Sequence, residues 1–435
     1  MEQVKNILIL STSNPYKTAG VVAYDIYQGF VKNGFHTKLI VENYDQYPDD
    51  GIVSIQSKGA HRRKQLKHKI RNKINKVLGK NKPYTDPSYH FDSPMLSQQK
   101  YATQAILKKA GFVPDVIIVI FAQNFISYKN LKELQNLSKA PILWQFADMH
   151  PFTGGCHYAW SCKGYQSLCQ QCPAILDKKH QNEPSTVLKR HLDLAKNLQI
   201  IPIIGSDWLI ERAAKSALYR DKKIEKIYLS LDHQYFKPEA PSVKEKLRAT
   251  YDVPQDSYVM LIMAKYLTHK RKGVEIILKA LSLLPAEVIK EKKLHLFVIG
   301  GELEKMKPYL TADLPLHNLT SIDRTELKSM YILSDLFISA SLQEVGPYTI
   351  TEALLCSVPV VALDHGYAKE FVIDHETGFL IKDDEPLSLQ KGILQQLQLK
   401  SDQLKEMKLR CRERTEKIVT KEKQIKQYIQ LINSL

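Results

Sequence analysis

The stretch SASLQEVGPYTITEALLCSVPVVA, from Ser339 to Ala362, carries the clearest structural pattern in the chain. An apolar run of strand length ends at Ser339, and a second one begins at Val358. Between them lies a loop, followed by helical periodicity from Thr349 to Leu355. Strands that alternate with helices predict a parallel sheet. Ligands bind such sheets at the carboxyl ends of the strands, so the loop after Ser339 is a candidate binding loop.

The same alternation extends over the rest of the chain. In the second half, apolar runs from Tyr258 to Met263 and from Leu294 to Ile299 flank a helical pattern from Gly273 to Leu284. The first half opens with an apolar run from Ile7 to Leu10 and a helical pattern from Val21 to Asn33. A chain of 435 residues is too long for one ordinary core. We therefore expect the α/β class, with two doubly wound Rossmann-like domains that face each other across a cleft.

A polar segment rich in Pro, Glu, Ala and Lys sets the expected domain boundary after Lys237. The expected N-terminal domain covers residues 1–237 and includes a Cys-rich loop, 148–173, and a basic helix, 58–82. The expected C-terminal domain covers residues 238–420. The last segment, 421–435, has helical periodicity and is expected to pack back on the first domain.

The composition is that of a globular protein, with 44% hydrophobic and 25% charged residues. No apolar run approaches the roughly 20 residues of a membrane span, and no signal peptide precedes the first strand, so we expect a cytoplasmic protein. Of the net charge of +16, eleven Lys and Arg residues lie between Gly51 and Thr85, where no Asp or Glu occurs. Within this stretch, Arg62–Lys80 predicts an amphipathic helix that binds an anionic membrane surface, which would place the protein peripherally at the inner face of the membrane. The alternative is a charged helix face that is merely solvated. Because no aromatic residues interleave with the basic ones, nucleic acid is not an expected partner.

Two segments carry residue types suited to a sugar diphosphate. Carboxylates such as Glu344 and Glu352 can bind sugar hydroxyls in a bidentate way, and Pro347 suits the first position of a helix whose free N–H groups attract an anion. The segment KYLTHKRKG, from Lys265 to Gly273, supplies cations that would stabilise a departing diphosphate. Two glutamates on the surface of a helix and a solvated basic loop are the plain alternatives.

These segments resemble two motifs of the family 4 GT-B glycosyltransferases. The resemblance implies that Glu344 lies beside the transferred sugar and that Glu352 binds the nucleotide ribose. It also implies that backbone at Gly346 and Pro347 faces the sugar and phosphates. The expected cations at the diphosphate are Lys265, Arg271 and Lys272. In the first loop the expected glycine is Gly20, and Ala19 replaces a second glycine of the family. Lys265 stands where the family has Arg, with one extra residue in the spacing.

A further stretch, DMHPFTGGCHYAWSCKGYQSLCQQCP, from Asp148 to Pro173, resembles a loop of the capsule and exopolysaccharide subgroup of the colanic-acid type. Ala147 replaces the histidine that the family has at this strand end, so Asp148 becomes the candidate catalytic residue on this side. His150 and His157 are candidates for acceptor contacts or proton handling, with hydrogen-bonded structural histidines as the alternative.

Four cysteines of this loop have the spacing C-x5-C-x6-C-x2-C, which predicts a structural zinc site, while free or disulfide-linked cysteines remain the alternative. The expected ligands are Cys156, Cys162, Cys169 and Cys172.

Taken with the resemblance, the sequence predicts a retaining glycosyltransferase of the hexosyltransferase type. It would move a sugar from a nucleoside-diphosphate sugar to a glycan or lipid-linked glycan during surface polysaccharide biosynthesis. The resemblance implies departure of the nucleoside diphosphate from the face that the acceptor attacks, with no cofactor required for transfer. The alternatives are a sugar-nucleotide epimerase or hydrolase on the same fold, and a basic nucleic-acid-binding protein.

Overall fold

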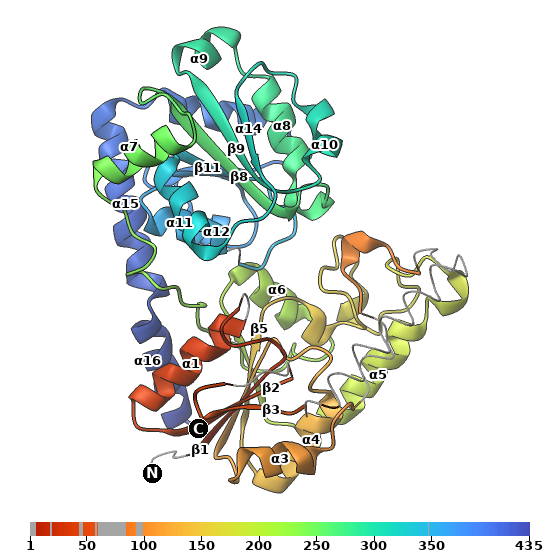
Figure 1. The fold of residues 1–435 in the computed structure, drawn as a ribbon. Coiled ribbons are helices and arrows are strands. Elements are labelled where there is room, and N and C mark those ends of the chain that lie inside the picture. Colours follow the sequence, from red (N-terminus) through yellow and green to blue (C-terminus); the bar gives the residue numbers. More distant parts are fainter. Residues whose placement is uncertain are drawn as a thin grey trace. The chain divides into compact units, whose positions relative to one another are not determined.

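The computed structural model describes residues 6–17, 20–42, 47–56, 59, 84–92, 99–346 and 348–435. The chain forms two compact units (Figure 1). The first consists of Met1–Leu229 together with Lys421–Leu435, and the second of Ser230–Thr420. Each unit is described by itself below.

The first unit is built on a seven-stranded parallel sheet in the order β3-β2-β1-β4-β5-β6-β7. Its central strands are continuous apolar runs that are buried on both faces, as parallel sheets require. The strands are β1 (Asn6–Ser11), β2 (His36–Val41), β3 (Ile52–Ser54), β4 (Val116–Ile120), β5 (Ile142–Phe146), β6 (Ile200–Ile204) and β7 (Glu225–Lys226). The helices are α1 (Gly20–Lys32), α3 (Thr103–Ala110), α4 (Tyr128–Ser138), α5 (Glu183–Ala195), α6 (Asp207–Lys215) and α16 (Lys421–Asn433).

The second unit contains a six-stranded parallel sheet in the order β10-β9-β8-β11-β12-β13. The strands are β8 (Tyr258–Tyr266), β9 (Leu294–Gly301), β10 (Leu316–Leu319), β11 (Leu336–Ser339), β12 (Val360–Leu363) and β13 (Gly378–Ile381). The helices are α7 (Pro241–Thr250), α8 (Val274–Ser282), α9 (Ala286–Glu291), α10 (Leu303–Met306), α11 (Arg324–Leu333), α12 (Tyr348–Leu355), α13 (Ala368–Phe371), α14 (Pro386–Leu397) and α15 (Ser401–Val419). In both sheets the strand order reverses once, between β1 and β4 and between β8 and β11, so both units are doubly wound as predicted.

The predicted domain boundary is eight residues too late. The second unit begins at Ser230, not at Pro238, because the intervening segment is already fixed to it. The Leu231 N–H donates to the Val419 carbonyl at 2.8 Å, and Phe236 is buried with its ring 6.2 Å from that of Tyr331. The polar composition that suggested a linker belongs to a segment whose few apolar side chains are packed.

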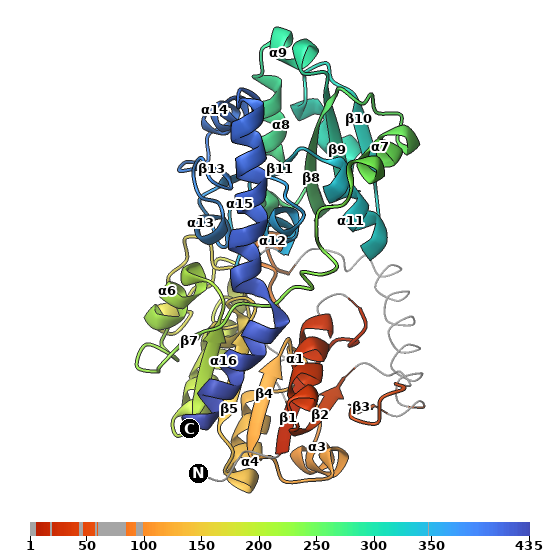
Figure 2. The same ribbon diagram turned by 90° about the vertical axis from the view of Figure 1, so that its left-hand side faces the viewer.

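The last helix, α16, packs on the first unit, beside α1 (Figure 2). Its Tyr428 is fully buried, with its ring 6.2 Å from that of Phe30 on α1. The Tyr428 hydroxyl donates to Oε1 of Gln145 on β5 at 2.7 Å. Helix α16 thus completes the hydrophobic core of the unit that also contains β5 and α1.

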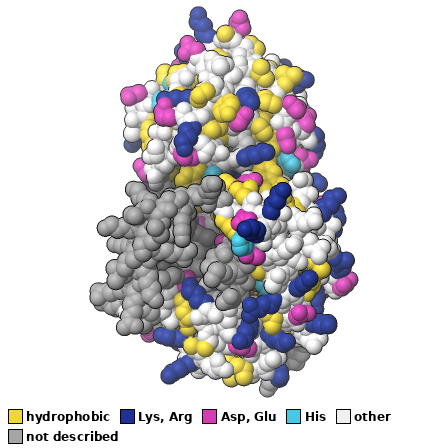
Figure 3. Space-filling model, turned by 90° about the vertical axis from the view of Figure 1, so that its right-hand side faces the viewer, with side chains coloured by type: hydrophobic (Ala, Val, Ile, Leu, Met, Phe, Trp, Pro, Cys, Tyr) yellow, Lys and Arg dark blue, Asp and Glu magenta, His cyan; other side chains and the backbone are white. Residues whose placement is uncertain are grey.

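The basic segment 58–82, with the predicted helix Arg62–Lys80, lies outside the described residues apart from Gly59. On the face drawn in Figure 3, Lys and Arg side chains are spread over the described surface and interleave with Asp and Glu. No helix in the described part of the chain has the length and apolar character that crossing a bilayer demands.

Candidate functional site

In the second unit, three of the predicted donor residues meet where the strand order reverses, at the carboxyl ends of β8 and β11. A short 3₁₀ turn, Lys270–Lys272, follows β8 and ends at Gly273, whose φ of 60° is in the left-handed region. A Cβ at Gly273 would lie 1.9 Å from the carbonyl oxygen of Ala340. Only glycine permits this approach, and the Leu342 N–H then donates to the Arg271 carbonyl at 2.8 Å. The two loops are therefore joined by their backbones.

Glu344 forms ion pairs with both cations of this turn. Its Oε2 lies 2.6 Å from Nη1 of Arg271 and 2.5 Å from Nζ of Lys272. Although burial opposes ionisation of the Glu344 carboxyl, the two cations lower its pKa below the usual value. Three of the predicted site residues thus form one charged cluster. A diphosphate that bound to Arg271 and Lys272 would compete with Glu344 for them.

Glu352 lies on α12 and is buried, with 8% of its surface exposed. Burial raises the pKa of its carboxyl to about 7, against a lowering by the Tyr331 hydroxyl, which donates to Oε2 at 2.8 Å. Tyr331, on α11, is fully buried as well. Glu352 is consequently a carboxylate whose charge changes near neutral pH and that accepts a hydrogen bond from a neutral donor, the Tyr331 hydroxyl.

The other predicted donor-side residues are separate from this cluster. Lys265 is exposed near the end of β8, with Nζ 5.4 Å from the centre of the Tyr266 ring. Gly346 packs under Tyr367, where a Cβ would lie 2.6 Å from the ring. Gly20 opens α1 in the first unit, where a Cβ would lie 1.8 Å from the Asn14 carbonyl oxygen. Pro347 lies outside the described residues.

The first unit contains a pocket of about 530 Å³, counted out to its open mouth, at the carboxyl ends of β4 and β5. Two buried polar atoms of its lining have no hydrogen-bond partner within the described residues: Oδ1 of Asn124 and Nδ1 of His191. Burial lowers the pKa of His191 to about 3, so this imidazole is neutral. Buried polar groups are normally paired, so these two atoms indicate a place for a polar ligand.

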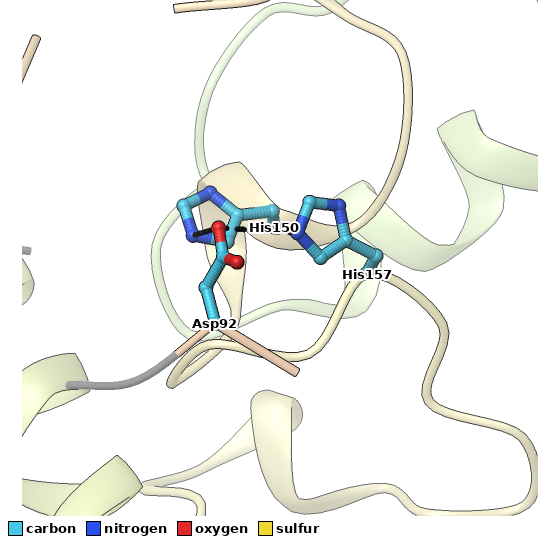
Figure 4. A group of neighbouring side chains, drawn as sticks. All are labelled: Asp92, His150 and His157. Atoms are coloured by element: carbon cyan, nitrogen blue, oxygen red, sulfur yellow. Dashed lines mark ion pairs between the residues drawn. The ribbon is translucent and has the colours of Figure 1, made fainter. Parts of the chain in front are cut away.

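Beside this pocket, two histidines and two aspartates form a cluster. The Nδ1 of His157 lies 2.7 Å from Oδ2 of Asp148. The Oδ2 of Asp92 lies 3.4 Å from Nε2 of His157 and 3.6 Å from Nε2 of His150. Figure 4 shows the Asp92 carboxylate directed toward the two imidazoles, whose rings stack with centres 4.9 Å apart. The structure thus unites all three candidates of the Asp148 loop and adds Asp92.

The two histidines of this cluster have opposite protonation preferences. Burial, together with His157, lowers the pKa of His150 to about 4. Burial also disfavours the cation of His157, but the carboxylates of Asp148 and Asp92 outweigh it and raise the pKa to about 10. Despite its own burial, Asp148 has a lowered pKa because His157 and His150 favour its charged form. In the absence of a bound cation, the cluster is an imidazolium held between two carboxylates.

The four cysteines of the predicted zinc site line one small cavity, together with Tyr89 and Tyr165. All four are free thiols rather than disulfides. Several backbone N–H groups are directed at their sulfurs, including that of Gly164 at 3.4 Å from Sγ of Cys162. Among the described residues, however, only Asp92, His150 and His157 bring three potential ligand atoms within 4.8 Å of one another. The sulfurs would have to move closer together to bind a tetrahedral ion, in which they lie about 3.8 Å apart.

Sequence reasoning missed Asp92, Asn124, His191 and Tyr331. Asn124 follows β4 at a strand end, a position that could have marked it. Asp92 lies in an irregular segment, and His191 and Tyr331 lie within amphipathic helices, where no local pattern separates them from structural residues.

Comparisons with known proteins agree with this architecture. Residues 243–418 match the family described as "Glycosyl transferases group 1". Among solved structures, sucrose-phosphate synthase from Thermosynechococcus elongatus aligns over 99% of this chain and 98% of its own, with a TM-score of 0.67 and 16% identity. The Anabaena protein HepE, solved in complex with UDP-glucose, aligns over 99% of this chain and all of its own, with a TM-score of 0.62 and 16% identity. At such identities the likeness concerns the fold.

Two curated relatives match a shorter region. A protein of Methanocaldococcus jannaschii described as an uncharacterized glycosyltransferase is 32% identical over 133 residues, which are 29% of this chain and 33% of the relative. A trehalose synthase of Pyrococcus horikoshii is 30% identical over 121 residues, or 28% of each chain. The matches thus span about a third or less of these relatives. The predicted enzyme class, a glycosyltransferase, is the class that the family description names. The chain has the GT-B fold of two Rossmann-like units, and its second unit contains a group 1 glycosyltransferase domain.

Proposed function

We propose that the chain is a retaining glycosyltransferase that uses a nucleoside-diphosphate sugar. The observation that supports this most strongly is the cluster of Arg271, Lys272 and Glu344 in a group 1 glycosyltransferase domain. The cluster lies at the point where the strand order reverses, the usual ligand position of an open α/β sheet. The solved HepE structure with UDP-glucose supports the donor class by analogy of fold alone.

The donor chemistry follows from this cluster. As the bond between the anomeric carbon and the phosphate oxygen breaks, its electron pair passes to the diphosphate, and Arg271 and Lys272 stabilise the added charge. Glu344, released from these cations, positions the sugar through its hydroxyls. Glu352 accepts hydrogen bonds from the ribose. Lys265, exposed at the end of β8, is a further cation for the phosphates, and the family resemblance assigns close backbone approach to the ligand to Gly20 and Gly346.

We place the acceptor in the pocket of the first unit, where Oδ1 of Asn124 and Nδ1 of His191 lack partners within the described residues. The acceptor hydroxyl attacks the anomeric carbon on the face that the diphosphate leaves, and its proton passes to the departing phosphate oxygen. Configuration is therefore retained, and no protein base is required. Asp148, which is fixed by its hydrogen bond to His157, holds the acceptor rather than deprotonating it.

The wider role that we propose is surface polysaccharide biosynthesis on a glycan or lipid-linked glycan acceptor. The basic segment Arg62–Lys80 supports it through its sequence, since its nine Lys and Arg residues would bind an anionic membrane at about 1 kcal/mol each. We also propose that Cys156, Cys162, Cys169 and Cys172 bind a structural zinc ion, because they surround one cavity and receive backbone N–H groups.

The test is a transfer assay with Glu344→Gln and a matched control. The purified chain would be incubated with radiolabelled UDP-, GDP- and ADP-sugars and a membrane glycolipid extract. We expect one donor to label the extract, loss of at least ~100-fold in rate for Glu344→Gln, and no change for Glu291→Gln, an exposed glutamate of the same unit that is paired to Lys292. Free sugar or an epimer as the only product would contradict the transferase assignment, and full activity of Glu344→Gln would contradict the site.

A further inference from the structure

In the first unit, the cluster of Asp92, His150 and His157 indicates a divalent-cation site. This site is distinct from the donor residues of the second unit. Its Asp92–His157 and Asp92–His150 separations, 3.4 and 3.6 Å, are too long for good hydrogen bonds. They match the spacing of atoms that share a metal ion. In a tetrahedral zinc site with bonds of about 2.0–2.1 Å, neighbouring ligand atoms lie about 3.3–3.4 Å apart.

From this geometry we propose that Nε2 of His150, Nε2 of His157 and Oδ2 of Asp92 bind a divalent cation of the Zn²⁺ class. Two imidazoles and one carboxylate are a ligand set that zinc and related metals accept, with a further position left for water or a substrate oxygen. The three side chains are each 20–26% exposed, so a fourth ligand can reach the ion from solvent.

The surrounding hydrogen bonds are those that a metal site requires. Metal-bound histidines usually donate their other ring nitrogen to a carboxylate, which fixes the ring. Nδ1 of His157 lies 2.7 Å from Oδ2 of Asp148, which leaves its Nε2 for the cation. The side-chain nitrogen of Asn124 lies 3.4 Å from the ligating oxygen of Asp92 and makes at most a weak hydrogen bond to it. Asp148 is thus a positioning residue here rather than a ligand.

The backbone holds the three ligands in place before any cation binds. They come from two segments, 84–92 and 148–157, which are paired directly. The Asp92 N–H donates to the Gly155 carbonyl at 2.9 Å, and the His157 N–H donates to the Tyr89 carbonyl at 3.2 Å. The Met149 N–H donates to the His157 carbonyl at 3.1 Å, which places His150 beside His157. The site needs little rearrangement to close.

Charge balance also favours a dication. With both imidazoles neutral, the carboxylates of Asp92 and Asp148 give the cluster two negative charges, which a divalent cation neutralises. A proton on His157 neutralises only one of them. The alternative is therefore an imidazolium between two carboxylates that binds no metal, and the experiment must separate the two states.

The experiment is a Co²⁺ titration of the chelator-treated full chain, followed by the visible absorption of the metal. A site with two nitrogens and one oxygen gives cobalt d–d bands without sulfur-to-cobalt charge transfer, whereas the cysteine cavity would give that transfer. We expect saturable binding of one Co²⁺ per chain in d–d bands free of charge transfer, separate from any Co²⁺ at the cysteines that gives the charge-transfer band, and competition by Zn²⁺. Binding that produces only the sulfur band, or no saturable binding, would overturn the proposal in favour of the imidazolium.

Variants assign the ligands. Asp92→Ala and His150→Ala should each remove the nitrogen–oxygen site, and Asp148→Asn should weaken its Co²⁺ affinity about 10–100-fold. The matched control is His180→Ala, because the half-buried His180 contacts the carboxylates of Asp177 and Glu183 elsewhere in the same unit. This variant should bind Co²⁺ normally. Unchanged binding in His150→Ala would refute the assignment. If an alanine variant does not fold, X-ray absorption of zinc bound to the wild-type chain decides, because nitrogen and oxygen ligands scatter differently from sulfur. A first coordination shell of sulfur alone would overturn the proposal.

Discussion

The protonation of Glu352 gives the sharpest test of the donor site. Burial holds the pKa of this carboxyl at about 7, so the group is half ionised at neutral pH before any ligand binds. Ribose hydroxyls donate to the carboxylate and gain little from the neutral acid. The affinity for the nucleoside diphosphate should therefore rise as pH increases through 7. This direction is opposite to that expected from Coulomb repulsion between the ligand and an added negative charge.

The magnitude follows from the fraction ionised. With a pKa of about 7, the carboxylate is about 90% populated at pH 8 and about 10% at pH 6, which corresponds to an affinity change of about tenfold, or ~1.4 kcal/mol. Glu352→Gln should bind about tenfold more weakly at pH 8, since it loses hydrogen bonds to a charged acceptor. It should also show none of this pH dependence. The Tyr331 hydroxyl can still donate to the amide oxygen, so the variant should fold.

Isothermal titration calorimetry at pH 6, 7 and 8 measures these affinities for whichever of UDP, GDP and ADP binds most tightly. The ligand's own phosphate titrates in this range, and dividing the wild-type affinity by that of Glu352→Gln at each pH removes this contribution. Tyr331→Phe provides a second control. It deletes the hydrogen bond that lowers the pKa of Glu352, so the midpoint should move to higher pH. A ratio that stays constant from pH 6 to pH 8 would refute the ribose role of Glu352.

Three further predictions concern the rest of the chain. Asp335 accepts the Val259 N–H and forms ion pairs with Lys244 and Arg248. Burial opposes its ionisation, but Lys244 and Lys408 lower its pKa, so its stabilisation is present above the ordinary Asp pKa and is lost as pH falls through the lowered one. Asp335→Asn should destabilise the second unit by about 3 kcal/mol at pH 7 in urea unfolding, and a loss below ~1 kcal/mol would contradict the buried ion pairs. The double substitution Cys169→Ser/Cys172→Ser should remove about one zinc per chain by elemental analysis, whereas Cys356→Ser, a buried thiol of the other unit, should not. Replacement of four basic residues by Glu should release the chain from vesicles that contain anionic lipid; the four are Lys67, Lys69, Arg71 and Lys73. Continued binding of this variant would exclude their membrane role.

The fold was largely predictable because both sheets are parallel and buried on both faces. Their strands are then continuous apolar runs, and the run from Leu336 to Ser339 coincides with β11. The polar edge strands β7 and β10 carry no such signal. The boundary error had a related cause, since residues 230–237 are polar in composition and are fixed by backbone hydrogen bonds and a single buried ring.

The candidate site was predictable only where one segment contains its residues. Glu344 and Arg271 belong to motifs that can each be recognised within one stretch of sequence, but their direct ion pair depends on the strand order of the second sheet. Asp92 lies more than 50 residues before His150 and His157 and reaches them through backbone hydrogen bonds between the two segments. No sequence pattern predicts this pairing. The pKa of Glu352 likewise depends on burial under elements that are distant in sequence.

The return of the last helix to the first unit has a consequence for synthesis of the chain. The hydrogen bond between Tyr428 and Gln145 joins residues 283 positions apart. The core around Phe30 therefore remains incomplete on the ribosome until α16 has emerged. Contacts of such long sequence separation slow folding and leave apolar surface exposed in the meantime. During translation the second unit, whose residues all precede α16, can finish folding before the first.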